Sequence, residues 1–406
     1  MIESPDQRRA LRLGLIALCV TEIISWGVLY YAFPVALSAI TADTGWSASA
    51  ASAAFSASLV VSAVVGISAG RLLDARGPRR VMTAGSVLAV PAVLGVAFAP
   101  NLAWFTAAWA VAGVAMAGVL YPPAFAAITR WYGEQRMRAL LVLTLVAGLS
   151  STIFAPLTAA LLDHLSWRAT FVVLALLLGL TTVPLHAFAL RPAWPVLTAE
   201  GAEHRRASVA RAVRSPGFVL LCLSFTTLAF GFYVASLGLI PLLSERGFTH
   251  SLAATTLGLL GAGQLLGRLA YGPMVQRLPS GGRLVAVVIV AAGSVVALAL
   301  LPAAAGVLIG AAVVLGAMRG LFTLLQAGVI AERWGTEAYG TLTGIFTAPI
   351  TTATALAPWA AAAGAEAVGS FRVLFLLLAA LTTLSAFVGV VSFIVDKPTQ
   401  VPKALR

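Results

Sequence analysis

Charged residues are scarce in this chain of 406 residues: Asp, Glu, Lys and Arg make up 10% of it, whereas hydrophobic residues make up 60%. Soluble domains carry roughly 25% charged and about 45–50% apolar residues, so the composition excludes a soluble globular protein. Apolar runs of roughly 20 residues recur from end to end, and each is long enough to cross a hydrocarbon core about 30 Å thick. The composition therefore predicts an all-α integral membrane protein.

Cysteine and histidine are also scarce. Cys19 and Cys222 lie in separate apolar runs without a CxxC spacing, which argues against a disulfide or a zinc site. The four histidines are scattered, and the chain has no metal-like spacing and no Walker A sequence. We therefore expect a protein that is not an enzyme, has no catalytic residues, does not hydrolyse ATP, and holds no metal or other cofactor.

Basic residues outnumber acidic ones by 26 to 14, which gives a formal net charge of +12. A nucleic-acid binder gathers its Lys and Arg on one exposed face, whereas here they stand in short connections between apolar runs. The positive balance therefore does not indicate a nucleic-acid partner, and we expect the lipid bilayer to be the main surrounding of the chain.

Twelve apolar runs, separated by charged or Gly/Pro breaks, predict twelve transmembrane helices. The first run stays apolar from about residue 13 to 40, too long for the 7–15-residue apolar region of a signal peptide, so we expect a retained span. The predicted spans cover residues 12–38, 48–70, 81–99, 102–128, 138–161, 167–189, 216–243, 252–276, 284–302, 304–330, 338–364 and 370–395.

The basic residues predict the orientation of these spans. With both termini cytoplasmic, 21 of the 26 Lys and Arg fall in cytoplasmic segments, and only Arg168, Arg246 and Arg372 fall in outer loops. This excess is what the positive-inside rule describes, and an error of one span would destroy it. We expect a multi-pass protein of the inner or plasma membrane.

A weak internal repeat divides the chain into two halves. Shifting the sequence by 202 residues aligns Tyr31 with Tyr233, Gly70 with Gly272, and FAPL (154–157) with LAPW (356–359). Two six-helix repeats with a site between them near the midplane are an arrangement of secondary transporters. The predicted organisation is a six-helix bundle over 1–189, a cytoplasmic linker over 190–215 and a second six-helix bundle over 216–406.

The connection between the second and third spans carries spaced glycine, aspartate and arginine. The positive-inside rule explains its arginines but not its glycines or its aspartate. Together with the span count and the repeat, this pattern resembles the bacterial members of the major facilitator superfamily over essentially the whole chain. The residues that carry the resemblance are Gly70, Leu72, Asp74, Gly77, Arg79 and Arg80.

The resemblance implies the major facilitator fold and a conformational gate at this loop. The resemblance implies that Asp74, near the end of the second span, pairs with basic residues across the inner gate when the carrier faces outward. Arg138, at the start of the fifth span, is the expected local partner. The second half has Gln276 at the position equivalent to Asp74, so we expect the gate charge to be asymmetric.

A second resemblance lies in the eighth span, where QLLGRLAYG (264–272) is similar to a segment of monocarboxylate porters and oxalate:formate-type antiporters. In those proteins an Arg meets the substrate carboxylate, and this Arg falls on Arg268. The animal porters have an Asp at the position of Gln264 and a Lys in the first span, which this chain lacks.

Three charged residues remain in the predicted membrane interior: Glu22, Arg268 and Arg319. Such residues are costly and usually face the bundle interior or a water-filled cavity. The family architecture implies that all three face one aqueous space, where two guanidinium groups favour an anion. Glu22 is the candidate proton site. The alternatives are an ion pair of Glu22 that ties the halves together, and arginines that serve gating or helix packing.

Uncharged candidates stand near these positions. Tyr121 lies in the middle of the fourth span beside two prolines that disrupt the helix, and we predict that it contacts substrate, together with Tyr30 and Gln264. Further hydrogen-bonding candidates are Trp26, Tyr31, Tyr233, Thr323 and Gln326.

We therefore predict a monomeric secondary transporter that moves a small organic anion, a carboxylate, by alternating access in symport with protons. The alternative is a proton-driven efflux antiporter of drugs or metabolites. Residues 148–162 keep Gly148 and Pro156 of the antiporter signature but have alanines where its other glycines are expected. A sensor built on the same fold is a third hypothesis.

Overall fold

The computed structural model describes residues 5–194, 199–302 and 304–395, which form helices and no β-strand. The described chain divides into two compact units. Unit 1 comprises residues 1–206 and 336–348, and unit 2 comprises 207–335 and 349–406. The predicted boundaries of the two bundles and the linker stay a prediction. The grouping of 336–348 with unit 1 is a feature that the sequence did not indicate.

Every predicted span coincides with helix, and several spans are interrupted. Unit 1 contains α1 (Pro5–Trp26), the π-helix η1 (Gly27–Tyr31), α2 (Ala32–Thr44), α3 (Ala48–Arg76), α4 (Pro78–Ala97), α5 (Leu102–Val119), α6 (Tyr121–Tyr132), the 3-10 turn η2 (Gly133–Gln135), α7 (Arg136–Ala147), α8 (Ser150–His164) and α9 (Trp167–Ala189). Unit 2 contains α11 (Pro216–Glu245), α12 (His250–Arg277), α13 (Ser280–Leu300), α14 (Ala305–Trp334) and α16 (Phe371–Val395). Two helices, α10 (Ala199–Arg214) and α15 (Tyr339–Val368), contribute residues to both units.

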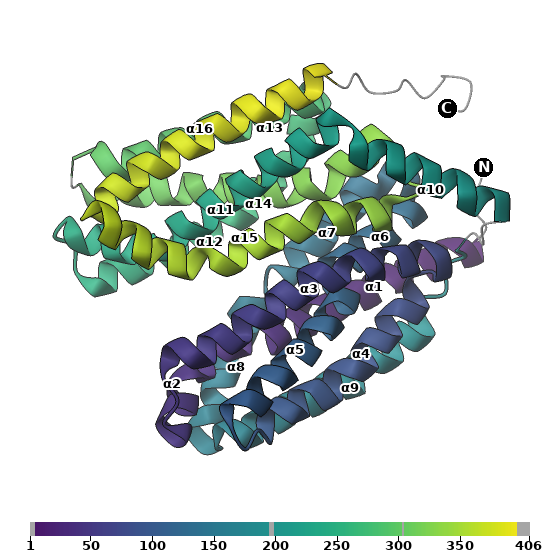
Figure 1. The fold of residues 1–406 in the computed structure, drawn as a ribbon, viewed down its shortest axis with the longest axis horizontal. Helices are drawn as coiled ribbons and strands as arrows, with labels where there is room; N and C mark the ends of the chain where they lie inside the picture. Colours follow the sequence, from purple (N-terminus) through teal and green to yellow (C-terminus); the bar gives the residue numbers. More distant parts are fainter. Residues whose placement is uncertain (1–4, 195–198, 303, 396–406) are drawn as a thin grey trace. The chain divides into compact units, whose positions relative to one another are not determined.

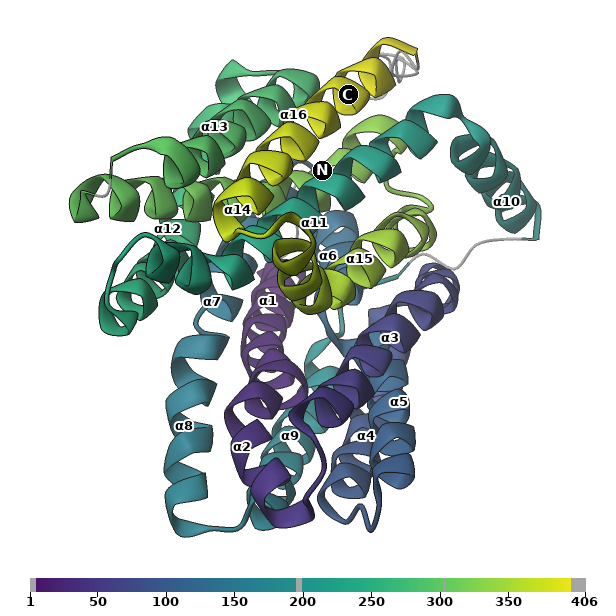
Figure 2. The ribbon, with the colours of Figure 1, turned by 60° about the vertical axis from the view of Figure 1, so that its left-hand side comes forward.

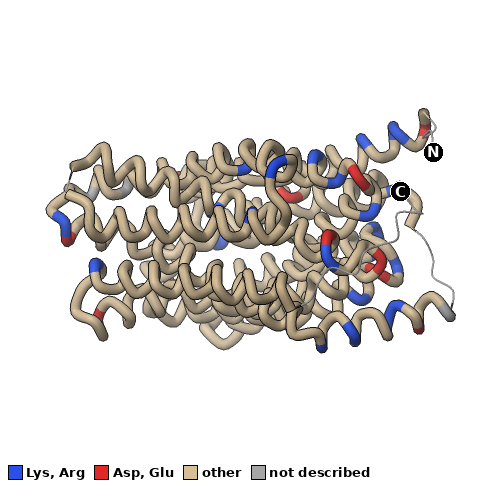
Figure 3. Tube along the Cα trace, turned by 90° about the horizontal axis from the view of Figure 1, so that it is seen from above, with Lys and Arg blue, Asp and Glu red and all other residues tan. Residues whose placement is uncertain are grey.

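The helices suit a bilayer. Within the described residues, nine helical segments are long and apolar enough to cross a membrane. In each unit the charged residues gather at the ends of the helices, and few lie along their middles (Figure 3). The chain is therefore a multi-pass membrane protein, while the count of twelve spans and the cytoplasmic location of both termini stay predictions. The polar segment predicted as a linker contains a helix, α10, that we did not expect.

Short polar residues fix where several helices begin. Ser47, Asn101, Ser166, Ser215 and Thr249 each precede a helix, and each side chain accepts a hydrogen bond from the backbone N–H three residues later. Such caps satisfy one of the N–H groups that have no partner within a helix. Local sequence thus defines these helix starts before any tertiary contact forms.

The packing pairs are distinct in each unit. In unit 1, α3 runs beside α5 and α4 beside α9 (Figure 1), and α8 lies beside α2 (Figure 2). A cluster of aromatic rings around Trp109 fills the core of this unit, with Phe55 and Phe105 edge-on to it. In unit 2 the closest pairs are α12 with α14 and α11 with α16.

Glycines bring α12 and α14 into backbone contact. A Cβ atom at Gly267 would overlap the carbonyl oxygen of Ala317, and one at Gly320 would overlap that of Gln264. Gly263 and Gly316 make equivalent contacts one turn earlier. Small residues at helix interfaces allow this approach in membranes, where burial of apolar surface gives little driving force. The four residues form a seam, which we call the α12–α14 seam, that fixes the two helices in register.

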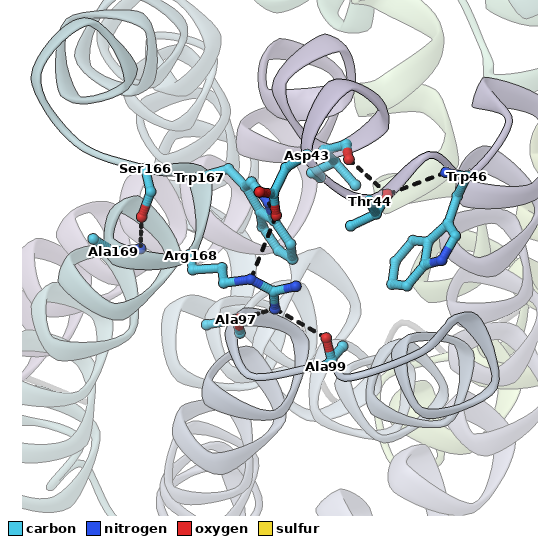
Figure 4. Close-up of polar contacts among 10 residues, drawn as sticks. Asp43, Thr44, Trp46, Ala97, Ala99, Ser166, Trp167, Arg168 and Ala169 are labelled. Atoms are coloured by element: carbon cyan, nitrogen blue, oxygen red, sulfur yellow. Dashed lines mark hydrogen bonds and ion pairs between the residues drawn. The ribbon is translucent and has the colours of Figure 1, made fainter.

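The end of unit 1 at which α2 ends and α9 begins is held by one acid and one arginine (Figure 4). Asp43, at the end of α2, accepts a hydrogen bond from the Trp167 indole at 2.8 Å, and its carboxylate lies 3.6 Å from the guanidinium of Arg168. Arg168 also donates to the carbonyls of Ala97 and Ala99, at 3.0 and 2.9 Å. These carbonyls end α4, where a helix has no internal partners for them.

Unit 2 repeats this arrangement with different residues. Glu245, offset by 202 residues from Asp43, accepts hydrogen bonds from the backbone N–H groups of Phe371 and Arg372 at the start of α16. Arg246 donates to the carbonyls of Leu298 and Leu301 at the end of α13. In each unit an acid thus ties the end of one helix to the start of another, α2 to α9 and α11 to α16.

We expect Gly316→Ala to destabilise the protein by about 1–3 kcal/mol, because the added methyl group must push the α14 backbone away from Leu260. The matched control is Gly310→Ala on the same helix, where a Cβ meets no atom within 4 Å. That change should be neutral or slightly stabilising, because alanine favours helix over glycine. Unfolding of the purified protein in mixed micelles measures both. Equal effects of the two substitutions would contradict the close seam.

Candidate functional site

Glu22 is fully buried in α1, with 0% of its surface exposed. Neither carboxylate oxygen has a hydrogen bond of regular geometry within the described residues. The buried indole N–H of Trp26, one turn further along the helix, lies near the carboxyl. The nearby Ser25 hydroxyl is also buried without a described partner. The predicted proton site is therefore a carboxyl buried beside two other polar side chains in an apolar helix bundle.

The helix changes its winding directly after Trp26. Residues 27–31 form the π-helix η1, in which the N–H of Ala32 bonds to the carbonyl of Gly27, five residues back. Such π segments are rare and frequently mark functional sites. The extra residue turns Tyr30 and Tyr31 relative to a regular helix, so that both rings meet Trp26, at centroid distances of 5.3 and 6.4 Å.

The predicted fourth span is broken at the residue before Tyr121. α5 ends at Val119, Leu120 is extended with φ −87° and ψ −170°, and α6 begins at Tyr121 followed by two prolines. Proline fits the first turn of a helix because it lacks the N–H that would be unpaired there. The break directs the Tyr121 ring to Trp26, 5.0 Å away between centroids. Glu22 and the rings of Trp26, Tyr30, Tyr31 and Tyr121 together form what we call the Glu22 cluster.

α8 packs against the helix that carries this cluster. A Cβ at Gly27 would overlap the ring of Phe154, so only glycine leaves room for that ring against the π-helix. Ser150, at the start of α8, donates a hydrogen bond of 2.7 Å to the carbonyl of Ile23. α8 thus binds the backbone next to Glu22 and holds the π segment in place.

In unit 2, Arg268 is buried in α12, with 6% of its surface exposed, and Gln264 is partly buried one turn before it. The α12–α14 seam sets their height relative to Arg319, because Gly267 packs on Ala317 and Gly320 packs on Gln264. These contacts advance together along both helices, so the helices run parallel. Arg268 and Arg319 therefore lie within about one helical turn, or about 5.4 Å, of each other along the helix axes.

Arg319 is held by α11. Its guanidinium carbon lies 4.1 Å from the centroid of the Tyr233 ring, and its Nη1 donates to the Ser236 hydroxyl at 3.1 Å. A cation over an aromatic face is stabilised by the ring quadrupole, by about 0.5–2 kcal/mol. Tyr233 is thus a positioning residue for this guanidinium, and Ser236 is a partner that the sequence did not single out.

The gate aspartate caps a helix. Asp74 is 2% exposed and accepts three hydrogen bonds: from Gly340 N at 3.0 Å, Thr341 N at 2.7 Å and the Thr341 hydroxyl at 2.6 Å. These donors belong to the first turn of α15, where N–H groups have no partner within the helix and a negative charge is favoured. A Cβ at Gly70 would overlap the carbonyl of Gly340, so glycine permits the close approach.

The expected pairing of Asp74 with Arg138 is absent from this structure. Both carboxylate oxygens are already occupied by the start of α15, and Arg138 is exposed on α7. Arg79 instead donates to the carbonyl of Ala187 at 2.7 Å, and Arg80 is exposed. Gly77 adopts φ +80°, a conformation that favours glycine, and caps α3.

Several participants were not predicted. Gly340 and Thr341 lie in the stretch AYGTLTG. Its glycines and threonines are compatible with the start of a helix, but they do not indicate that Asp74 caps it. Ser150 carried no signal beyond its polarity. Within the described residues, no group of three or more His, Cys, Asp or Glu is arranged to hold a metal ion.

Comparisons with known proteins agree with this architecture. The family model described as Major Facilitator Superfamily matches residues 18–347. The chain is 25% identical over 272 residues to monocarboxylate transporter 13 of Bos taurus, covering 65% of this chain and 59% of that protein. It is 27% identical over 329 residues to the same transporter of Rattus norvegicus, covering 79% and 73%. The chain thus spans less than two thirds of the bovine relative's length.

Solved structures share the fold. The E. coli fucose:proton symporter FucP superposes with a TM-score of 0.71 at 14% identity, covering 93% of this chain and 98% of that one. The human organic anion transporter MFSD10 superposes with a TM-score of 0.73 at 16% identity, covering 95% and 100%.

We expect Asp74→Asn to lower the free energy of unfolding by about 1–3 kcal/mol, because an amide can accept at only one of the two oxygen positions and places its own N–H groups against donors. Asp163→Asn, an exposed change on α8, is the control and should have no effect. Thr341→Val should destabilise the wild type more than it destabilises Asp74→Asn. Additive effects in this double-mutant cycle would show that the two side chains are not coupled.

Proposed function

This protein belongs to the Major Facilitator Superfamily and is a membrane transporter rather than an enzyme, and we propose that it carries a small organic anion, a carboxylate, together with a proton. The observation that carries the proposal is the placement of Arg268 and Arg319 on two helices locked in register by the α12–α14 seam. Two guanidinium groups in an apolar bundle are expensive unless they serve an anion or an internal partner.

The guanidinium geometry supports a carboxylate as cargo. A planar guanidinium binds a carboxylate through two parallel hydrogen bonds, which a lysine ammonium cannot reproduce. Gln264, one turn from Arg268, supplies an amide for a further hydrogen bond, and Tyr233 holds Arg319 in one orientation. Two similar proteins are themselves named as a monocarboxylate transporter and an organic anion transporter.

We expect Arg268→Ala to reduce carboxylate uptake into proteoliposomes about tenfold or more, since it removes charge-assisted hydrogen bonds worth about 1.5–3 kcal/mol. Arg268→Lys should retain part of the activity, because it keeps the charge but not the planar fork. Arg277→Ala, an exposed change at the end of the same helix, is the control. A thermal-shift screen of small mono- and dicarboxylates selects the substrate to be used. Normal uptake by Arg268→Ala would refute the proposed cargo site.

Glu22 is proposed as the site of proton coupling. An ionised carboxylate buried without an ion pair costs several kcal/mol, so this residue has reason to carry a proton during part of the cycle. The rings of Trp26 and Tyr121 keep the surroundings apolar, and the Trp26 indole and Ser25 hydroxyl are near enough to respond to the carboxylate when it ionises. Tyr30 and Tyr121 are proposed to contact the cargo from unit 1.

Glu22→Gln should abolish accumulation driven by an imposed pH gradient, while exchange of labelled for unlabelled substrate continues, because glutamine cannot release a proton. Glu134→Gln, at an exposed position, is the control. Accumulation by Glu22→Gln at the wild-type level would refute the coupling role. If substrate instead moves into the proton-rich compartment while protons leave it, the efflux antiporter is the correct mode.

Alternating access is proposed to use the loop Gly70–Arg80 as its gate. The three hydrogen bonds on Asp74 would hold α15 in one state and break in the other, and the exposed Arg80 and Arg138 would keep the loop at the cytoplasmic surface. The proposal also includes a monomer with two six-helix halves in the cell membrane.

A further inference from the structure

Trp194 is the last described residue before α10, within the segment that the sequence marked only as a polar linker. It follows α9 by five residues and is partly buried against unit 1. Its indole N–H donates a hydrogen bond of 3.2 Å to the backbone carbonyl of Asp74. This carbonyl belongs to the last turn of α3, where carbonyl groups have no partner within the helix. The linker thus supplies the missing partner at the residue that carries the gate carboxylate.

The ring of Trp194 makes two further contacts beside the gate. A Cβ at Gly77 would lie 2.9 Å from the ring carbon Cγ of Trp194, so the ring packs directly on the backbone of the turn that follows Asp74. On the other side, the guanidinium carbon of Arg130 lies 4.7 Å from the ring centroid. One side chain therefore contacts the carbonyl of Asp74, the turn after it and a neighbouring cation.

The charges around the ring also act on Asp74. Arg130, on α6, interacts electrostatically with Asp74 and with Glu337, and Arg205, on α10, interacts with both Asp74 and Arg130. The contact of the Arg130 guanidinium with the Trp194 ring stabilises Arg130 at this position, although the positive charge of Arg205 repels it. The segment after α9 thus contacts the candidate gate through Trp194, and Arg205 adds an electrostatic interaction with Asp74.

We infer that Trp194 is a positioning residue for the gate: it fixes the end of α3 so that the Asp74 carboxylate meets the first turn of α15. The hydrogen bonds to Gly340 and Thr341 are short, at 2.6 to 3.0 Å, and such bonds weaken steeply when distance or angle changes. A shift of the α3 terminus is enough to lose them. Movement of the linker is in this way transmitted to the gate.

The inference rests on the proposed gate role of Asp74, but its test needs no transported substrate. Hydrogen exchange of the purified full-length protein in lipid nanodiscs reports directly on the amides of Gly340 and Thr341, which donate to Asp74. Trp194→Phe keeps a ring and removes only the indole N–H. It should accelerate exchange of these amides about two- to tenfold, the factor by which one hydrogen bond shifts an equilibrium. Trp194→Ala, which also loses the stacking on Arg130, should accelerate it further.

The matched control is Trp104→Phe. Trp104 also donates its indole N–H to a backbone carbonyl of unit 1, that of Gly95 at 3.0 Å. Gly95 lies in the last turn of α4, whereas Asp74 lies just before the start of that helix. This change should leave exchange at Gly340 and Thr341 unaltered. In an Asp74→Asn background, Trp194→Phe should add nothing, because the carboxylate through which it acts is gone.

Two outcomes would overturn the inference. One is unchanged exchange at Gly340 and Thr341 in Trp194→Ala. The other is acceleration of similar size throughout the helices of unit 1, which would mean that the residue only stabilises the fold. Neither outcome depends on whether Arg268 binds an anion, so failure of the cargo proposal leaves this test intact.

Discussion

A bilayer offers no water to backbone N–H and C=O groups, so every departure from helix must be satisfied inside the protein. The departures in unit 1 are few, and they lie together. The π-helix after Trp26 and the extended Leu120 both bring tyrosine rings to Trp26, which lies beside Glu22. The carbonyl of Ile23 accepts a hydrogen bond from the Ser150 hydroxyl of α8. The same rule applies at helix ends, where Asp74 satisfies the N–H groups of α15 and Trp194 satisfies a carbonyl of α3. The Glu22 cluster and the candidate gate thus lie where helices are interrupted or end, whereas Arg268 and Arg319 lie within continuous helices.

The sequence predicted the parts of this arrangement that are local or conspicuous. Helix positions followed from apolar runs, and the interruption at Tyr121 followed from its two prolines, because proline acts on the adjacent backbone. Glu22, Arg268 and Arg319 stood out because charge is rare in lipid. The π-helix was not predictable, since no residue of GVLYY demands it, and the Phe154 ring that packs on Gly27 comes from a distant helix. The capping of α15 by Asp74 was not predictable, because two of the three donors are backbone N–H groups, which nearly every residue carries.

The two halves of the internal repeat share structural contacts at their helix ends but differ in their candidate functional residues. Asp43 and Glu245, offset by 202 residues, each accept hydrogen bonds from the start of a later helix of their unit, α9 and α16 respectively. Functional charges differ. The buried acid of the candidate site lies in unit 1, whereas the candidate cargo arginines lie in unit 2, and Gln276 stands where the second half would need an aspartate. Under the proposed function, the two halves therefore share a scaffold but carry different charged residues.

The α12–α14 seam fixes the spacing between the two candidate cargo arginines. The four glycines of this seam place the backbones of α12 and α14 in direct contact. The spacing between the backbone positions of Arg268 and Arg319 is therefore set by the thickness of two touching helices. Under the proposed function, this fixed spacing would select an anion by its length as well as by its charge.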